Sequence, residues 1–431
     1  MNTRRERLSD GLSHGPSHGP SHDKGTLEAA PDLLSGVSLP AAVVFERPLA
    51  HNLAWMQRFA DAHGARLAPH GKTTMAPSLF HRQLEAGAWG VTLATAPQCR
   101  AALAHGVTRL LMANQLVGEA NMAIIADLIE AGADVYCVVD GSENVSQLGR
   151  FFTARGLRLK VLIELGVMGG RCGCRDQDEV MALGEQIQES PALVLAGLEG
   201  YEGVVVSDEP QQDVLAYAWH LVEAAQALDH DGLFEAHQPI LTASGSAWYD
   251  LIAGVFHEAR LGKHFVPVLR PGCYVVHDHG LYREAQHGVL RRRPELEKGL
   301  LPALEVFAQV QSLPEPGLAI VAMGKRDIGG DRLPLALRRY REGGSAGQDL
   351  GVAGWEVVKL MDQHAFVRLP TTSEEAFDGD MRVGDVRVGD VRVGDIVAFG
   401  TSHPCLTFDK WRTILLVNER LEVTEVMATC F

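Results

Sequence analysis

Short apolar, β-rich runs alternate with longer amphipathic runs from Arg66 onward. The amphipathic runs, such as residues 76–88, 118–132 and 211–230, repeat their apolar positions at helical spacing. Eight strand–helix units in about 200 residues are typical of a TIM (β/α)8 barrel, which we take as the α/β fold class of this part. The apolar runs lie at residues 65–69, 89–94, 109–113, 135–139, 159–165, 193–198, 239–242 and 266–269.

A doubly wound parallel sheet is the alternative architecture for this alternation. It rarely contains eight such regular units, and no Gly-x-Gly-x-x-Gly sequence follows an early strand. The pattern therefore favours the barrel over a dinucleotide-binding fold.

After about Tyr282 the apolar pattern changes to short runs separated by turns, which predicts a C-terminal, mainly-β domain. The apolar run 41–45, before the barrel, could pair with that domain. We therefore expect a disordered tail over 1–36, a barrel over 37–283 and a β-rich domain over 284–431. The predicted strands of the last domain lie within 303–313, 318–324, 355–361, 365–370, 395–400 and 413–420.

Two segments have low complexity. The first repeats Ser-His-Gly-Pro and is expected to be disordered to about Ser35, with histidines better explained as part of a polar leader than as metal ligands. The second, 381–395, repeats a five-residue unit. An odd period turns side chains to alternate faces of a strand, so this segment predicts a lengthened loop or hairpin.

Composition excludes several function classes. The 431 residues carry a net charge of -15, which argues against a nucleic-acid partner, because such binding needs a surplus of Lys and Arg. The chain has no apolar run near the roughly 20 residues that span a bilayer, and its start does not resemble a signal peptide. Seven cysteines in a chain of this length suit reduced thiols in the cytoplasm.

One lysine attracts attention because Gly71-Lys72-Thr73 matches the end of a nucleotide-binding P-loop. The first glycine of that motif would fall at position 66, which is Arg66, and Pro69 lacks a backbone N–H. The motif is therefore not a P-loop, and Lys72 needs another explanation.

The chemistry of a TIM barrel lies at the carboxyl ends of its strands, and several reactive residues fall there. A lysine follows the first strand, and two loops rich in Gly and Ser follow the seventh and eighth, where this fold typically binds phosphate. This arrangement suggests pyridoxal phosphate, joined to the lysine as a Schiff base. The candidates at the strand ends are His70, Lys72, Arg171, Tyr201, Ser244, Gly245, Ser246, Gly272 and Cys273.

Each of these signals has a plain structural reading. A lysine at a strand end is often a surface residue, Gly-Ser loops are common turns, and an Arg or Tyr often only packs or hydrogen-bonds. Their agreement in position is what favours a cofactor site.

Four motifs, "PHGKTTM", "SGS", "RPGCY" and "HPC", resemble those of D-serine dehydratase and its relatives D-threonine aldolase and D-threo-3-hydroxyaspartate dehydratase. These enzymes belong to the alanine racemase-like class that uses pyridoxal phosphate. The resemblance covers nearly all of residues 38–431 and leaves out the N-terminal tail and the five-residue repeat. It implies a barrel followed by a β domain, and a homodimer.

The resemblance also implies a role for each matched residue. It implies that Lys72 forms the Schiff base, that Tyr201 lies beside the pyridine nitrogen and that Arg171 lies near the cofactor hydroxyl. The phosphate would be held by Ser244, Gly245, Ser246, Gly272 and Cys273. A neutral tyrosine leaves the ring a weaker electron sink than a carboxylate partner would, so the reaction is expected to need a metal.

His403 and Cys405 are the candidate metal ligands. On an extended chain, positions i and i+2 project to one face, and imidazole with thiolate suits zinc. A buried histidine beside a core cysteine is the structural alternative. The resemblance implies zinc on a matching His-x-Cys pair in dehydratases, whereas aldolases typically have His-x-Asp, so Cys405 favours dehydration. His364 also matches a family histidine.

Cys172 and Cys174 form a second pair of cysteines. This pair could bind a metal or be oxidised, but a structural or incidental role is the favoured interpretation.

The function expected from these residues is deamination of a D-β-hydroxy amino acid, with D-serine as first choice and pyruvate and ammonia as products. Lys72 would take the α-proton and the metal would assist departure of the β-hydroxyl. Three alternatives remain: an aldolase, a racemase, which needs a second base that the sequence does not show, and a non-catalytic carrier of pyridoxal phosphate, which would resemble the barrel alone.

Overall fold

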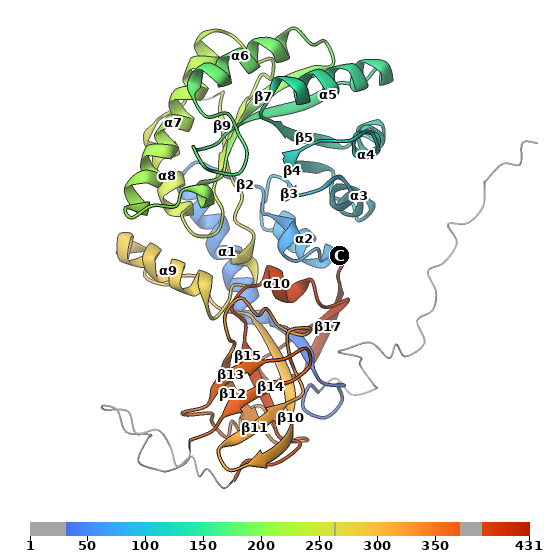
Figure 1. Ribbon diagram of the computed structural model, residues 1–431, viewed down its shortest axis with the longest axis vertical. Helices are drawn as coiled ribbons and strands as arrows, with labels where there is room; N and C mark the ends of the chain where they lie inside the picture. Colours follow the sequence, from blue (N-terminus) through green and yellow to red (C-terminus); the bar gives the residue numbers. More distant parts are fainter. Residues whose placement is uncertain (1–31, 263, 371–389) are drawn as a thin grey trace, which may run out of the picture.

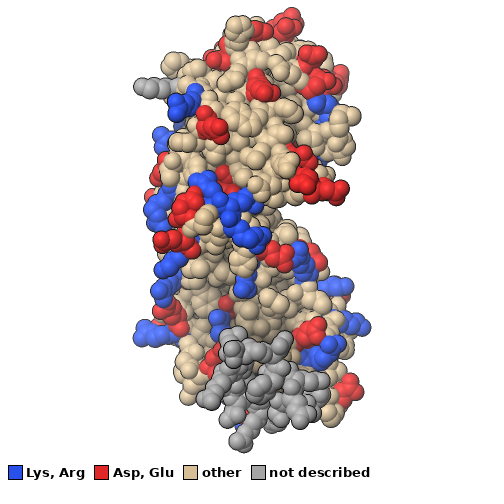
Figure 2. Space-filling view, turned by 90° about the vertical axis from the view of Figure 1, so that its left-hand side faces the viewer, with Lys and Arg blue, Asp and Glu red and all other residues tan. Residues whose placement is uncertain are grey.

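The computed structural model describes residues 32–262, 264–370 and 390–431. It has two stacked parts, an α/β barrel and a β part, with α1 (Glu46–Ala62), α9 (Leu281–Arg292) and α10 (Cys405–Phe408) at their junction (Figure 1). Figure 2 shows an indentation at this junction, and acidic and basic side chains interspersed over the face that it presents. Within these described ranges, none of the helices combines the length and apolar character needed to cross a membrane.

The expected eight-stranded barrel is present. All eight strands are parallel and follow the order β2-β9-β8-β7-β6-β5-β4-β3. The two ends of this curled sheet approach each other through a bridge between His70 and Thr92 and a backbone hydrogen bond of 2.9 Å from Thr92 to Pro69. The strands are β2 (Arg66–Leu67), β3 (Val91–Leu93), β4 (Arg109–Gln115), β5 (Asp134–Val139), β6 (Leu159–Leu165), β7 (Leu193–Gly200), β8 (Ile240–Ala243) and β9 (Val266–Leu269).

Side chains from many strands fill the barrel, including Leu111, Val138, Leu162 and Val268, which are all fully buried. The helices cover the outside with their apolar faces, as their periodicity predicts. They are α2 (Pro77–Glu85), α3 (Ala96–Ala104), α4 (Glu119–Glu130), α5 (Ser142–Arg155), α6 (Gln177–Gln188), α7 (Pro210–His230) and α8 (Tyr249–Glu258).

The β part is a mainly antiparallel sheet in the order β13-β14-β11-β10-β1-β16-β17, with β15 also pairing with β10 and β12. The first strand of the chain, β1, lies inside it, antiparallel to β10 and parallel to β16, which confirms the pairing expected for residues 41–45. The strands are β1 (Ala41–Phe45), β10 (Leu304–Glu315), β11 (Leu318–Val321), β12 (Leu335–Tyr340), β13 (Glu356–Leu360), β14 (Ala365–Arg368), β15 (Ile396–Gly400), β16 (Thr413–Val417) and β17 (Val423–Ala428).

Three features differ from the sequence-based expectations. Helix α9 crosses the expected boundary between residues 283 and 284, and strands β12 and β17 were not expected. The expected disordered tail does not extend to residue 36, because Leu33 and Leu34 are buried against the β part and the backbone of Leu33 hydrogen-bonds to Leu421 at 2.9 Å. Most of the five-residue repeat, like residues 1–31, lies outside the described residues.

Candidate functional site

Lys72 lies at the carboxyl end of the barrel, in the short 3-10 helix η1 (Gly71–Thr73) that follows β2. The backbone N–H of Thr73 donates to His70 O at 3.2 Å and closes this turn. A Cβ on Gly71 would meet the ring of Phe80 at 2.8 Å, so the turn can pack here only without a side chain at that position. This packing holds the lysine at the mouth of the barrel.

The environment of Lys72 favours its neutral amine. Desolvation lowers the pKa of Lys72, and repulsion from Arg171 and Arg270 lowers it further, while Cys405 and Cys273 act in the opposite direction. The side chain nevertheless keeps accessible surface. A crowded but reachable amine of lowered pKa is suited to accept a proton or to attack a carbonyl.

Arg171 and Tyr201 lie together, from the loops after β6 and β7. The guanidinium carbon of Arg171 is 5.2 Å from the centre of the Tyr201 ring, and its terminal nitrogen is 3.6 Å from Oε1 of Glu164. Burial raises the pKa of the Tyr201 phenol, so this group stays neutral near pH 7. The pair therefore presents one fixed cation and one neutral hydroxyl-bearing ring.

The loops of Ser244–Ser246 and Gly272–Cys273 contact each other. The hydroxyl oxygen of Ser246 accepts hydrogen bonds from the backbone N–H groups of Gly272 at 3.2 Å and Cys273 at 3.1 Å. Cys273 begins a second 3-10 helix, η3 (Cys273–Val275). These converging N–H groups are of the kind that holds phosphate.

Backbone strain marks the start of the first loop. Ser244 has φ of 86° and is buried, a conformation that costs energy for any residue other than glycine and often marks a functional site. The next residue, Gly245, donates its N–H to the carboxylate of Glu202 at 2.7 Å, and a Cβ on it would lie 2.8 Å from the Tyr201 ring. The loop thus tolerates only glycine beside that ring.

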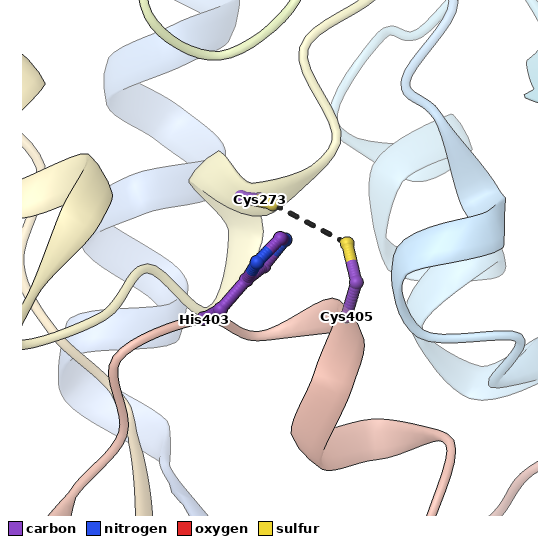
Figure 3. A group of neighbouring side chains, drawn as sticks. All are labelled: Cys273, His403 and Cys405. Carbon is purple, nitrogen blue, oxygen red and sulfur yellow. Dashed lines mark hydrogen bonds between the residues drawn. The ribbon is translucent and has the colours of Figure 1, made fainter. Parts of the chain in front are cut away.

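Cys273, His403 and Cys405 form a group of potential metal ligands in which the ligand atoms all lie within 4.8 Å of one another (Figure 3). The sulfur atoms of Cys273 and Cys405 are 3.6 Å apart. Cys405 Sγ is also 3.5 Å from the hydroxyl of Thr73, the residue after Lys72. The group is therefore adjacent to the lysine, although Cys405 belongs to the β part.

A carboxylate orients the histidine of this group. The Nδ1 atom of His403 is 3.3 Å from Asp331, which also accepts a hydrogen bond of 2.6 Å from the Ser402 hydroxyl. With Nδ1 engaged, Nε2 remains available as a ligand. Histidines that bind metals are commonly held by a carboxylate in this way.

The thiols differ in their proton affinity. Hydrogen bonds from Cys273, and then from His403 and Thr73, lower the pKa of Cys405 well below its ordinary value, whereas burial raises the pKa of Cys273. This direction favours the thiolate form of Cys405, the form that binds metal ions.

The structure brings most of the predicted residues to one end of the barrel. The expected extended conformation of the His403–Cys405 segment is wrong. The His403–Cys405 segment is not extended, because Pro404 has helical angles and Cys405 begins α10, yet both side chains face one point. The sequence interpretation missed the thiol of Cys273 as a potential ligand and missed Asp331. His70 contributes a buried Nδ1 that has no hydrogen-bond partner in the described residues.

Two sequence candidates lie outside this arrangement. His364 is exposed in the turn between β13 and β14, where its carbonyl accepts from Met361 N–H. Cys172 and Cys174 flank Gly173, whose N–H donates to Asp140 at 2.9 Å, and neither cysteine belongs to a group of ligands among the described residues. These contacts fit a structural role for the loop.

A separate cavity of about 650 Å³ opens between the loops after β6 and β7. Arg175, Asp213 and His220 contribute polar groups to its wall, and it includes none of the candidate site residues. We therefore place the candidate site at the strand ends, where the reactive residues lie, and not in this cavity.

The residues of the site fit two groups, a phosphate-bearing cofactor and a metal ion. Converging backbone N–H groups, a strained serine and glycines that admit no Cβ suit a phosphate-bearing cofactor within reach of Lys72. Thiols and an oriented imidazole suit a soft divalent metal such as zinc.

Comparison with known proteins gives matches in both parts of the chain. Residues 46–272, just over half of the chain, match the family model "Alanine racemase, N-terminal domain". Residues 303–417 match the model "Putative serine dehydratase domain".

Curated relatives and solved structures agree with these matches. The chain is 29% identical over 343 residues to D-threonine aldolase from Arthrobacter sp., covering 78% of this chain and 82% of that protein. It is 28% identical over 208 residues to D-threo-3-hydroxyaspartate dehydratase from Delftia sp. (strain HT23), covering 47% and 54%. A cysteine-to-alanine variant of D-threo-3-hydroxyaspartate dehydratase, solved in the metal-free form, shares the fold with a TM-score of 0.72 at 21% identity, over 93% of this chain and 99% of that one.

Proposed function

Because the chain belongs to the alanine racemase N-terminal domain family, with a serine dehydratase-like β part, we propose that it is a pyridoxal phosphate-dependent lyase of D-β-hydroxy amino acids. Its reaction would be a metal-assisted β-elimination with D-serine as the first substrate, giving pyruvate and ammonia. The names of the curated relatives, an aldolase and a dehydratase of such amino acids, support the substrate class.

The observation that carries this proposal is the contact between the lysine turn and the ligand group. The Thr73 hydroxyl, one residue after Lys72, is 3.5 Å from Cys405 Sγ. A base and a metal centre would therefore act on neighbouring carbons of one small substrate. Such an arrangement suits removal of an α-proton and a β-hydroxyl from the same molecule.

The residues that would hold the cofactor are those at the strand ends. Lys72 would hold its carbonyl carbon through Nζ, and the loops of Ser244–Ser246 and Gly272–Cys273 would hold its phosphate. Tyr201 would lie beside the ring nitrogen and Arg171 beside the ring hydroxyl. When bound, pyridoxal phosphate withdraws electrons from the α-carbon of an attached amino acid and so acidifies its α-proton.

Lys72 is the proposed general base. The substrate amine would replace Nζ at the cofactor's carbonyl carbon and so free the Lys72 amine. Its lowered pKa increases the fraction of neutral amine at a given pH, and this form would accept the α-proton at Nζ. Arg171 keeps a positive charge within range of that amine and so opposes its protonation. Cleavage of the Cα–H bond then leaves its electron pair to form the Cα–Cβ double bond as the Cβ–O bond breaks.

His403 and Cys405 would hold zinc, which would supply Lewis acidity to the departing β-oxygen. Asp331 keeps the imidazole in position through Nδ1. The thiolate ligand favours zinc over manganese or magnesium, which prefer oxygen ligands. The water lost in the elimination is regained on hydrolysis, so that D-serine yields one pyruvate and one ammonia.

The test is incubation of the purified, cofactor- and zinc-loaded protein with D- and L-serine, D- and L-threonine and D-threo-3-hydroxyaspartate. Oxo acid, ammonia, aldehyde, glycine and enantiomer are measured in the same samples. We expect oxo acid and ammonia in equal amounts from the D substrates only. Lys72→Ala should lower the rate by about 10³-fold or more, and Lys298→Ala, which changes an exposed lysine, should not. Absence of oxo acid from every D substrate would overturn the proposal.

An aldolase is the second candidate function, favoured by the extended match to D-threonine aldolase. It would produce glycine and acetaldehyde from D-threonine, with no ammonia. The thiolate of Cys405 argues for elimination, and the product analysis decides between the two reactions.

A further inference from the structure

Cys273 has a backbone and a side chain that serve different neighbours. Its N–H points to Ser246 in the proposed phosphate loop, at 3.1 Å. Its thiol instead faces the β part and lies 3.6 Å from Cys405 Sγ; it is also 4.0 Å from the hydroxyl of Thr73 in the barrel. The residue is 3% exposed, so this thiol is directed into the ligand group and away from solvent (Figure 3).

The distance between the two sulfurs matches shared coordination. Two sulfur atoms bound at about 2.3 Å to one tetrahedral zinc ion are separated by about 3.8 Å. The observed 3.6 Å between Cys273 Sγ and Cys405 Sγ is close to that edge length. His403 completes a triangle in which no two ligand atoms are more than 4.8 Å apart.

We propose that Cys273 is the third protein ligand of the metal, which makes the centre a Cys₂His site joining the barrel loop after β9 to the β-part loop after β15. This inference rests on the proposed metal-dependent function and extends it. It assigns to the cysteine of "RPGCY" a role in addition to the phosphate contact of its backbone.

Charge and coordination number support this role. Two thiolates and a neutral imidazole balance the charge of Zn²⁺, whereas one thiolate would leave a net positive centre close to Lys72, Arg171 and Arg270. Three protein ligands is also the usual number for catalytic zinc, which keeps one position open for substrate. A single open position fits a substrate that presents one β-oxygen.

The test counts the sulfur ligands of the zinc in the cofactor-loaded protein by X-ray absorption at the zinc edge. Zn–S distances of about 2.3 Å are distinct from Zn–N and Zn–O distances of about 2.0–2.1 Å, so the count does not depend on activity. We expect two sulfur ligands in the unaltered protein and one in Cys273→Ser. Zinc affinity, measured by competition with a chelator, should fall at least about tenfold in this variant.

Two further variants keep the experiment decisive. Cys430→Ser, which changes a half-buried cysteine outside the ligand group, should leave two sulfur ligands and unaltered affinity. Cys273→Ala replaces the serine variant if that one does not fold. One sulfur or no bound zinc in the unaltered protein, or an unchanged count in both Cys273 variants, would overturn the proposal.

The outcome is separable from that of the proposed function. Turnover of a D-β-hydroxy amino acid by a protein with one sulfur ligand on zinc would contradict the role of Cys273 and support the lyase function. Two sulfur ligands without turnover of any such substrate would support the role of Cys273 and contradict the lyase function.

Discussion

At the scale of single residues, the site depends on groups whose two ends have different partners. Cys273 offers an N–H to one loop and a thiol to another, and His403 engages Asp331 through Nδ1 while Nε2 stays available. Lys72 combines accessible surface with a desolvated amine. In each case the reactivity comes from neighbours in space and not from the residue type alone.

The lowered pKa of Lys72 predicts that its amine is acylated at lower pH than an ordinary lysine. Below its pKa an amine is protonated and unreactive, so a group of lowered pKa becomes nucleophilic at lower pH than an ordinary lysine. In cofactor-free protein treated with acetic anhydride over a pH series, Lys72 should be labelled faster than the exposed Lys298 at each pH below about 9. Peptide mass spectrometry measures both rates together. Equal pH profiles for the two lysines would contradict the assigned environment.

At the scale of elements, two short 3-10 helices place the chemistry. Helices η1 and η3 follow the neighbouring strands β2 and β9, so they lie side by side where those strands end, with Thr73 of η1 against Cys273 of η3. Gly272 precedes η3, and a Cβ on it would meet the Thr73 hydroxyl and, at 2.7 Å, the carbonyl oxygen of His70. The close approach of these two turns therefore requires glycine there.

Two glycine-to-alanine changes should have opposite effects. Gly272→Ala forces the turns apart and should destabilise the protein by about 1–3 kcal/mol, with weaker cofactor binding. Gly254→Ala, inside α8 where nothing lies within 4 Å of a new Cβ, should stabilise it by about 0.5–1 kcal/mol. Urea unfolding and titration with pyridoxal phosphate measure the two effects. Equal stability changes would contradict the tight contact.

At the scale of the whole molecule, each end of the described chain connects the barrel to the β part. Strand β1 precedes the barrel but lies between β10 and β16 of the β part, and the backbone of Cys430 hydrogen-bonds to Met75 of the barrel at 2.7 Å. The ligand group crosses the same junction, since Cys273 comes from one part and His403 and Cys405 from the other.

Metal binding across the junction should therefore stabilise the whole fold. A ligand present at about 100 times its dissociation constant adds about 2.7 kcal/mol to the stability of the native state. Removal of zinc by a chelator should lower the thermal midpoint by several degrees, and added zinc should restore it while magnesium should not. Scanning calorimetry at fixed cofactor concentration measures the change. The metal-dependent shift should shrink in Cys273→Ser and persist in Cys430→Ser; a midpoint independent of zinc in all three proteins would argue against a metal that bridges the parts.

The sequence by itself determined the eight-stranded barrel, six of the later strands, the pairing of residues 41–45 and the strand-end positions of Lys72, Arg171 and Tyr201. These follow from local apolar patterning, which is strong where a strand is buried on both faces, as in β6 and β8. Strand β12 escaped detection because its arginines, Arg338 and Arg339, are neutralised by partners distant in the chain, Glu305 and Asp395.

Only the tertiary structure decided how the strand-end residues combine. Cys273 and Cys405 are separated by 132 positions, and Asp331 by 72 from His403, so no local pattern connects them. Their side chains meet because the loop after β9 and the start of α10 pack together at the junction of the two parts. Periodicity records which face of an element is buried, whereas ligand geometry depends on distances between elements, which are set only when the whole chain packs.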